Sequence, residues 1–229
     1  MKIILDHVTK IIKKATVIDG ISAKWTSGKV YGLCGYNGCG KTMLMRLVAG
    51  LIRPTEGSVT IDGKELGKDM DFPESIGLMI ENPAFLDNYT ALENLKLIAS
   101  LKKKATEQDC IDALNRVNLD SNDVRTFKKF SLGMKQRLGI AAAIFEKPDL
   151  ILLDEPTNAL DADGTELAAK IIREERNRGA LIILACHERE FLENAADEVI
   201  KIEHGKFVED EMKTENESQA CLLSKQIAI

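Results

Sequence analysis

The stretch Gly35-Tyr36-Asn37-Gly38-Cys39-Gly40-Lys41-Thr42 follows the pattern G-x-x-x-x-G-K-T. An apolar run before it, residues 30–34, predicts a strand, and residues 41–49 after it predict a helix. Glycines let the backbone wrap around an anion so that successive N–H groups point inward, and the helix N-terminus adds positive potential. A strand, a glycine-rich turn and a helix in this order therefore predict a loop that binds phosphate groups.

The octapeptide resembles the phosphate-binding loop of P-loop nucleotidases, which implies that the chain binds a nucleoside triphosphate. In that loop the lysine, here Lys41, reaches the β- and γ-phosphates, and the hydroxyl of Thr42 is a ligand of Mg²⁺. An ordinary glycine-rich turn is the alternative. The nucleotide-binding residues predicted in this part of the chain are Gly35, Asn37, Gly38, Cys39, Gly40, Lys41, Thr42 and Met43.

A second apolar run, Leu150–Leu153, ends in the two acids Asp154 and Glu155. A buried parallel strand delivers its groups at the carboxyl end, where the ligands of such sheets collect. Asp154 is placed to hold Mg²⁺ through water, and Glu155 is placed to polarise the attacking water as general base. A solvated acidic turn is the alternative for this pair.

Periodicity and turn signals predict an α/β fold with a mostly parallel sheet, because strands and helices alternate. Strands are expected at residues 3–8, 17–25, 30–34, 57–62, 75–80, 150–153, 181–185, 198–203 and 206–209. Helices are expected at residues 41–49, 92–101, 110–117, 132–146, 164–178 and 188–195. The chain reads as a single domain over residues 1–229, with a helical insertion at about 84–146 and a polar tail at about 210–229.

Composition places the chain among ordinary globular proteins. Its net charge of -5 argues against nucleic acid as the main partner, because a phosphate backbone requires a basic surface. No apolar run approaches the length that spans a bilayer, and the first residues lack the apolar stretch of a signal peptide. The cysteine count of five is odd, and Cys34 and Cys39 lack the spacing of a zinc knuckle or a redox pair, so we expect reduced thiols in a cytoplasmic protein.

Three further motifs, in order along the chain, resemble the ATP-binding cassette of ABC transporters. Phe130-Ser131-Leu132-Gly133-Met134 stands where the family has its signature sequence L-S-G-G-Q. Asn158-Ala159-Leu160-Asp161 resembles the loop that links the two composite sites, and His187 resembles the switch histidine. The resemblance covers residues 2–209. It implies a P-loop NTPase core with an N-terminal antiparallel β subdomain and an inserted α-helical subdomain.

The resemblance also implies a composite site for ATP and Mg²⁺ between two chains. Family members dimerise head to tail, so the phosphate loop of one subunit faces the signature of the other. Ser131 and Gly133 would then contact the γ-phosphate in trans, and His187 would read the same phosphate in cis as a catalytic residue. A single phosphate loop and a single signature imply that the partner is a second copy or a paralogue.

A transmembrane permease is the second partner that the family implies. ATP binding would close the dimer, hydrolysis would open it, and the permease would convert that motion into transport. We therefore expect a cytoplasmic ATPase, peripheral on the membrane through the permease, with no nucleic-acid partner. Phe85, Leu86 and Tyr89 form a short apolar segment that is either a socket for the permease or part of the core.

The chain departs from the family pattern at several positions. Ile11 and Ile12 stand where an aromatic residue usually stacks on adenine, which predicts a weaker or less selective contact with the base. Met43 replaces a hydroxyl that contacts the α-phosphate, and Leu132 replaces a signature glycine.

The fourth departure is Glu81, where the family typically has glutamine after a strand. The glutamine supplies an oxygen to Mg²⁺ or water, so Glu81 is a candidate metal ligand and catalytic residue. With Asn82-Pro83-Ala84-Phe85 and the run Ser131–Leu138, it resembles cassettes of bacterial exporters that confer immunity to lantibiotics and related peptide antibiotics.

Two other classes of function compete with transport. One is an ABC-type ATPase that acts on nucleic acid or ribosomes, whose members carry long coiled coils or two cassettes in one chain. The other is a P-loop kinase, in which the signature helix and His187 would have no role. Neither class fits the motifs as well as an ATPase subunit of an exporter.

Overall fold

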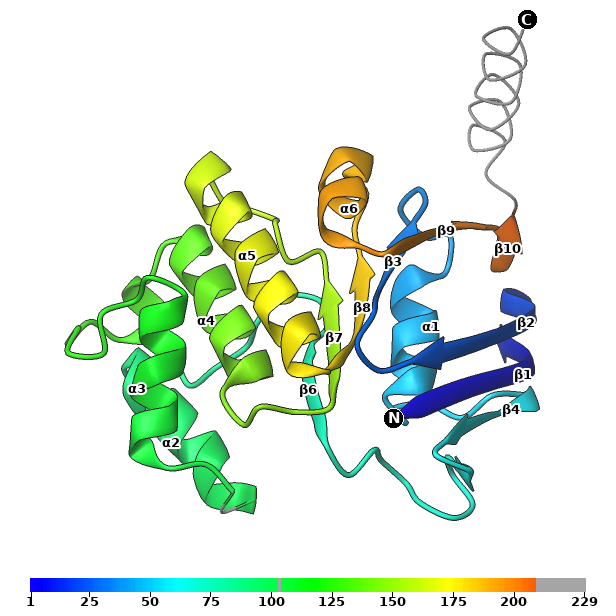
Figure 1. Ribbon diagram of the computed structural model, residues 1–229, viewed down its shortest axis with the longest axis horizontal. Coiled ribbons are helices and arrows are strands. Elements are labelled where there is room, and N and C mark those ends of the chain that lie inside the picture. Colours follow the sequence, from blue (N-terminus) through cyan, green and yellow to red (C-terminus); the bar gives the residue numbers. More distant parts are fainter. Residues whose placement is uncertain (103, 209–229) are drawn as a thin grey trace, which may run out of the picture.

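The computed structural model describes residues 1–102 and 104–208, which form the arrangement of sheets and helices in Figure 1. The strands are β1 (Lys2–Ile12), β2 (Ala15–Thr26), β3 (Val30–Cys34), β4 (Glu56–Ile61), β5 (Lys64–Glu65), β6 (Ile76–Met79), β7 (Leu150–Asp154), β8 (Leu181–Ala185), β9 (Glu198–Glu203) and β10 (Lys206–Val208). The helices are α1 (Lys41–Val48), α2 (Ala91–Lys102), α3 (Glu107–Arg116), a 3₁₀ helix (Phe127–Lys129), α4 (Leu132–Ile144), α5 (Ala162–Arg178) and α6 (Arg189–Ala195). The expected tail at 210–229 lies outside the described residues.

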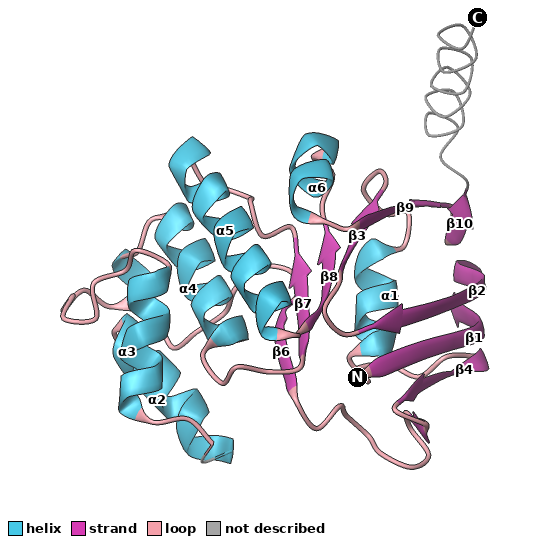
Figure 2. Cartoon of the chain, in the orientation of Figure 1, coloured by secondary structure: helices cyan, strands magenta, loops and turns pink. Residues whose placement is uncertain are grey.

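The central sheet has six strands in the order β10-β9-β3-β8-β7-β6 (Figure 2). Strands β9, β3, β8, β7 and β6 pair in parallel, and β10 pairs antiparallel with β9. Along β7, Ile151 and Leu153 join one hydrophobic core while Leu150 and Leu152 join the other. Helices cover both faces, which is why this strand is a continuous apolar run. The predicted α/β fold with a mostly parallel sheet is confirmed.

A second sheet is antiparallel, with the order β2-β1-β4-β5, and α1 lies between it and the central sheet (Figure 1). Its β1–β2 hairpin is longer than the expected strands at 3–8 and 17–25. The expected strands left residues 9–16 as the connection, but only Lys13 and Lys14 make the turn. Both have positive φ, 46° and 71°, and two consecutive residues in the left-handed region make the tightest hairpin turn.

The helices expected between residues 84 and 146 are present as α2, α3 and α4, which pack together at one end of the molecule (Figure 1). A capping box opens α2. The backbone N–H of Thr90 donates to the Glu93 carboxylate over 2.8 Å, and the backbone N–H of Glu93 donates to the Thr90 hydroxyl over 3.2 Å. Within residues 1–102 and 104–208, the helices are all too short or too polar to cross a membrane.

Candidate active site

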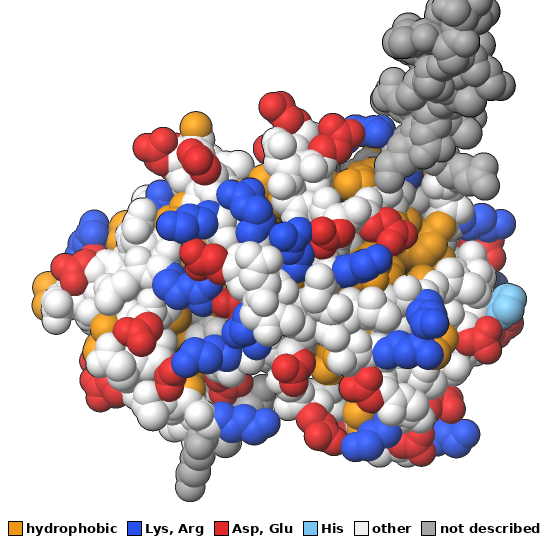
Figure 3. Space-filling view, in the orientation of Figure 1, with side chains coloured by type: hydrophobic (Ala, Val, Ile, Leu, Met, Phe, Trp, Pro, Cys, Tyr) orange, Lys and Arg blue, Asp and Glu red, His pale blue; other side chains and the backbone are white. Residues whose placement is uncertain are grey.

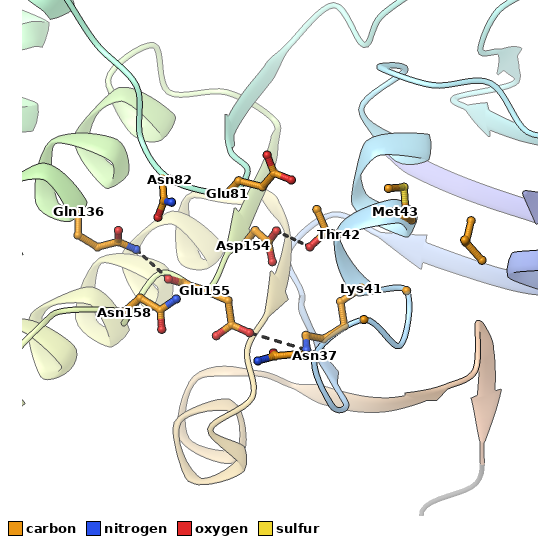
Figure 4. A pocket seen from close by; sticks show the side chains of 13 residues that line it. Asn37, Lys41, Thr42, Met43, Glu81, Asn82, Gln136, Asp154, Glu155 and Asn158 are labelled. Atoms are coloured by element: carbon orange, nitrogen blue, oxygen red, sulfur yellow. Dashed lines mark hydrogen bonds and ion pairs between the residues drawn. The ribbon is translucent and has the colours of Figure 1, made fainter. Parts of the chain in front are cut away.

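A cavity of about 440 Å³ lies at the carboxyl ends of β3, β6 and β7 (Figure 4). It brings together nine of the residues predicted from the sequence, although they come from three distant segments. These are Asn37, Gly38, Gly40, Lys41, Thr42, Met43, Glu81, Asp154 and Glu155. The predicted residues Gly35, Cys39, Ser131, Gly133 and His187 do not line this cavity.

The loop between β3 and α1 has the backbone that an anion cradle requires. Gly38 and Gly40 have φ values of 86° and 119°, in the region that favours glycine. A Cβ at Gly40 would lie 2.9 Å from the carbonyl oxygen of Val17, so a side chain there would collide with β2. The first backbone N–H groups of α1, which begins at Lys41, have no intrahelical partner and can face a phosphate.

The ammonium group of Lys41 is buried at the centre of this loop. Its Nζ donates to the carbonyl oxygen of Gly35 over 2.7 Å and lies 3.7 Å from Oε1 of Glu155. The side chain is only 6% exposed, so the positive charge is shielded from water and directed at the cavity. This position suits a cation that binds phosphate.

Thr42 and Asp154 form a pair of oxygen atoms across the cavity. Oγ1 of Thr42 donates to Oδ2 of Asp154 over 2.7 Å, and the aspartate is 4% exposed. Burial raises the pKa of Asp154, the Thr42 hydroxyl opposes that shift, and the charge of Glu155 adds to it. A hydroxyl and a buried carboxylate whose charge lacks full compensation are the donor set that Mg²⁺ prefers, so the residues fit this ion.

Glu155 lies one residue further, at the turn after β7, and its carboxylate is held from two sides. Oε2 lies 2.8 Å from Nδ1 of His187, and Oε1 faces Lys41. The backbone N–H of Glu155 donates to the carbonyl oxygen of Ala185 at the end of β8 over 2.7 Å. With a φ of 49°, Glu155 has a backbone conformation that few L-residues adopt, and these contacts offset its cost.

Glu81 lines the cavity, but its carboxylate has a partner other than the Thr42–Asp154 pair. Oε1 of Glu81 lies 2.6 Å from Nη2 of Arg46, and the glutamate side chain is 61% exposed. Arg46 stands one helical turn after Thr42 on α1. Thr42 and Arg46 therefore lie on the same face of α1. Thr42 contacts Asp154 at the end of β7, and Arg46 contacts Glu81, which follows β6.

The signature residues lie on the first turn of α4, outside the cavity of their own chain. Oγ of Ser131 accepts the backbone N–H of Met134 over 3.2 Å and so caps the helix. Leu132, the departure from the family pattern, is 72% exposed. The role of Ser131 and Gly133 in trans stays a prediction.

Four residues of the cavity wall were not among the predicted site residues: Val17, Asn82, Gln136 and Asn158. Gln136 is the most informative, because its Nε2 donates to the backbone carbonyl oxygen of Glu155 over 2.7 Å (Figure 4). It is 7% exposed and stands among apolar residues on the buried part of α4. A polar residue inside an apolar helical pattern is the signal that could have revealed it.

Comparison with known proteins agrees with this geometry. The profile of the family described as ABC transporter matches residues 18–158. An uncharacterised ABC transporter ATP-binding protein of Bacillus subtilis is 50% identical over 87% of this chain and 92% of its own length. A lantibiotic transport ATP-binding protein of Streptococcus pyogenes is 34% identical over 97% and 96%. A bacitracin transport ATP-binding protein of Enterococcus faecalis is 36% identical over 90% and 67%.

Solved structures of ATP-binding cassettes share the fold. A dimeric bacterial ABC transporter cassette superposes with a TM-score of 0.82 at 23% identity, over 90% of this chain and 97% of that chain. The same cassette in a post-hydrolysis state with ADP and phosphate gives 0.81 at 22% identity, over the same shares. The family match covers the phosphate loop, the signature and the acidic strand. The resemblance is thereby confirmed: the chain belongs to the ABC transporter family, as a subunit that binds and hydrolyses ATP.

Proposed function

We propose that this chain powers an exporter of a peptide antibiotic of the lantibiotic or bacitracin type, working as a dimer on a separate permease. The observation that carries the proposal is the 34% identity with a lantibiotic transport ATP-binding protein over 97% of the chain. The cassette geometry supports the energy-supplying part of this role. The proposed cargo and the direction of transport are inferred from the names of the relatives.

ATP hydrolysis follows from the groups around the cavity. The phosphate loop and Lys41 bind the triphosphate, and the Lys41 charge stabilises the negative charge that develops on the γ-phosphate. Thr42 and Asp154 would hold Mg²⁺, which when bound neutralises charge on the phosphate oxygens. Glu155 takes a proton from the attacking water, and His187 orients its carboxylate. Glu81, which lines the same cavity, would adjust the affinity of the site for Mg²⁺.

Dimerisation places Ser131 and Gly133 of one subunit on the nucleotide of the other. Their position outside their own cavity supports this assignment, because the first turn of α4 then remains available to a second subunit. The free N–H groups of that turn suit a phosphate. The dimeric form of the similar cassette supports it as well.

A permease would dock in the groove of about 420 Å³ between β6 and the helical segment. Phe85 lines this groove, but its ring also packs against Phe127 with 5.3 Å between centroids, so it contributes to the core. Leu86 and Tyr89 are 46% and 43% exposed beside it. These two residues are the better candidates for direct contact with a partner.

Transport is favoured over action on nucleic acid by the distribution of charge. On the face drawn in Figure 3, Lys and Arg side chains are interspersed with Asp and Glu side chains over the described residues. Nucleic-acid binding requires positive charge gathered along one stripe or patch. The family membership and the transport relatives point the same way.

The test is to capture the membrane partner of this chain by pull-down from native membranes and to co-express the two proteins in a host that is sensitive to lantibiotics and bacitracin. We expect co-purification, ATPase stimulation by the permease, and resistance that requires both proteins. Leu86→Asp should abolish co-purification and leave basal ATPase activity intact. Val124→Asp, at an apolar residue 86% exposed in the helical segment, is the matched control and should change neither. An ATPase that ignores the permease and responds to nucleic acid would overturn the proposal.

A further inference from the structure

The first turns of α4 lie against the whole segment that follows β7. A Cβ on Gly133 would lie 3.0 Å from the carbonyl oxygen of Ala159. Nη2 of Arg137 lies 3.5 Å from Oδ1 of Asp161, the residue that caps α5. Between them Gln136 reaches the backbone of Glu155, at the start of the same segment. The helix that begins beside Ser131 therefore contacts the segment at both of its ends.

The contact with Glu155 is directed at the point where the chain turns. The Glu155 carbonyl oxygen accepts two hydrogen bonds, one from Nε2 of Gln136 over 2.7 Å and one from the backbone N–H of Asn158 over 3.2 Å. Pro156 follows Glu155, and a proline in that position of a turn fixes its own φ. The φ of Glu155 itself is 49°, so its peptide plane needs external support to stay in place.

Burial makes the Gln136 contact a strong constraint. The side chain is 7% exposed, and a buried amide that lost its acceptor would carry a desolvation cost. Its acceptor is the backbone carbonyl group of Glu155, whose carbon is bonded to the Cα that carries the carboxylate side chain. A shift of the Gln136 amide would therefore turn the Glu155 carboxylate away from His187 and Lys41, whose atoms lie 2.8 and 3.7 Å from it.

We propose that Gln136 is a positioning residue that ties the orientation of Glu155 to the helix carrying the signature. The inference rests on the proposed role of Glu155 as general base. Ser131 caps the same helix, so the position of α4 at the signature sets the position of the base through Gln136.

Two substitutions remove the hydrogen bond in the full chain. Gln136→Leu removes the donor, and Gln136→Asn shortens the side chain so that it no longer reaches. For both we expect kcat to fall about 10- to 100-fold, the effect of displacing a catalytic group by about 1 Å, with ATP affinity within about twofold of wild type. Gln108→Leu is the matched control, because Gln108 is exposed on α3 and its amide bonds only Asp112 in the structure described.

Gln136→Glu supplies a readout that packing alone does not move. An ionised carboxylate has no donor and repels the Glu155 carbonyl oxygen, whereas a protonated one donates a hydrogen bond again. Burial disfavours the ionised form, so the pKa of the introduced glutamate rises. We expect the kcat of Gln136→Glu, divided by that of wild type at each pH, to rise as pH falls from about 8 to about 6.

The outcomes separate this inference from the assignment of Glu155. If Glu155→Gln is inactive but Gln136→Leu keeps wild-type kcat, the positioning role is wrong and the base assignment stands. If Glu155→Gln hydrolyses ATP normally, the base assignment fails first. A flat pH ratio for Gln136→Glu, or equal losses in kcat and ATP affinity for Gln136→Leu, would show that Gln136 acts only in packing.

Discussion

The Nδ1 atom of His187 lies 2.8 Å from Oε2 of Glu155, and the pair joins the ends of the adjacent strands β7 and β8. Because the backbone of Glu155 also bonds Ala185, the two strand ends hold the carboxylate at two points. This geometry predicts that Glu155→Gln keeps the hydrogen bonds and the fold but loses the proton acceptor. We expect hydrolysis to fall about 10²- to 10⁴-fold.

ATP binding should survive in Glu155→Gln, so the stalled protein should accumulate as an ATP-dependent dimer in gel filtration. His187→Ala provides the comparison, because it leaves the carboxylate in place but frees it to rotate. A Glu155→Gln protein that hydrolyses at the wild-type rate, beside an inactive His187→Ala protein, would transfer the role of base to His187.

Asp154 provides a test of the metal site through stability. Its folded-state pKa is raised, first by burial, so the ionised form weakens the fold, and the unfolding free energy falls as pH rises from the ordinary pKa toward the raised one. Asp154→Asn removes that charge. Without nucleotide we expect a Tm at neutral pH no lower than wild type, and with MgATP we expect the ligand-induced rise in Tm to be lost.

Thermal unfolding with EDTA, with ATP plus EDTA and with MgATP separates the two effects. Asp62→Asn, at an exposed turn aspartate, serves as the control for removing one negative charge. An Asp154→Asn protein that keeps the full Mg²⁺-dependent rise in Tm would exclude Asp154 from the metal site.

Much of the central sheet and of the cavity could be predicted from local sequence. Strand β7 is a continuous apolar run that ends in acids, and the loop Gly35–Thr42 carries glycines where φ is positive. Local pattern fixes both, because burial on two faces and left-handed backbone restrict the residue types. Both capping boxes, at Thr90 and Thr106, also depend only on residues three apart.

Contacts between distant segments could not be predicted in this way. The Gln136–Glu155 bond spans 19 residues, and the Arg46–Glu81 ion pair spans 35. Tyr36 forms a hydrogen bond with His204, 168 residues away, with 2.9 Å between the phenol oxygen and Nδ1. Each pairing depends on how helices and strand ends pack against one another in the folded chain, and hydrophobic periodicity says nothing about that arrangement.

Substitution of Lys41 tests the assignment of the phosphate loop. Lys41→Ala removes the buried cation that the loop surrounds and that faces Glu155. A charge-assisted hydrogen bond contributes about 1.5–3 kcal/mol, so ATP affinity should fall about 10- to 100-fold and turnover should collapse. Fluorescent nucleotide titration measures the first and phosphate release the second. Lys170→Ala, at an exposed lysine on α5, should change neither; a Lys41→Ala protein with wild-type ATPase would refute the loop assignment.

Glu81 links the metal side of the cavity to α1 through Arg46, with 2.6 Å between the charged groups. A carboxylate near Mg²⁺ binds the ion more strongly than an amide oxygen does, yet it repels the triphosphate when the metal is absent. Arg46 offsets part of that repulsion while the pair is intact. Glu81→Gln should therefore make the ATPase rate depend less steeply on free Mg²⁺ than in wild type.

The measurement is an ATPase titration with Mg²⁺ at fixed ATP, together with resistance of cells to a peptide antibiotic. Glu74→Gln is the matched control, because it removes a surface ion pair of similar length, 2.8 Å to Lys64, away from the cavity. Superimposable Mg²⁺ curves and unchanged resistance would mean that position 81 tolerates either residue. If Glu81→Gln hydrolyses ATP normally but protects cells poorly, then Glu81 acts in coupling to the permease, because the chemistry of the site would be intact while the transmitted motion is lost.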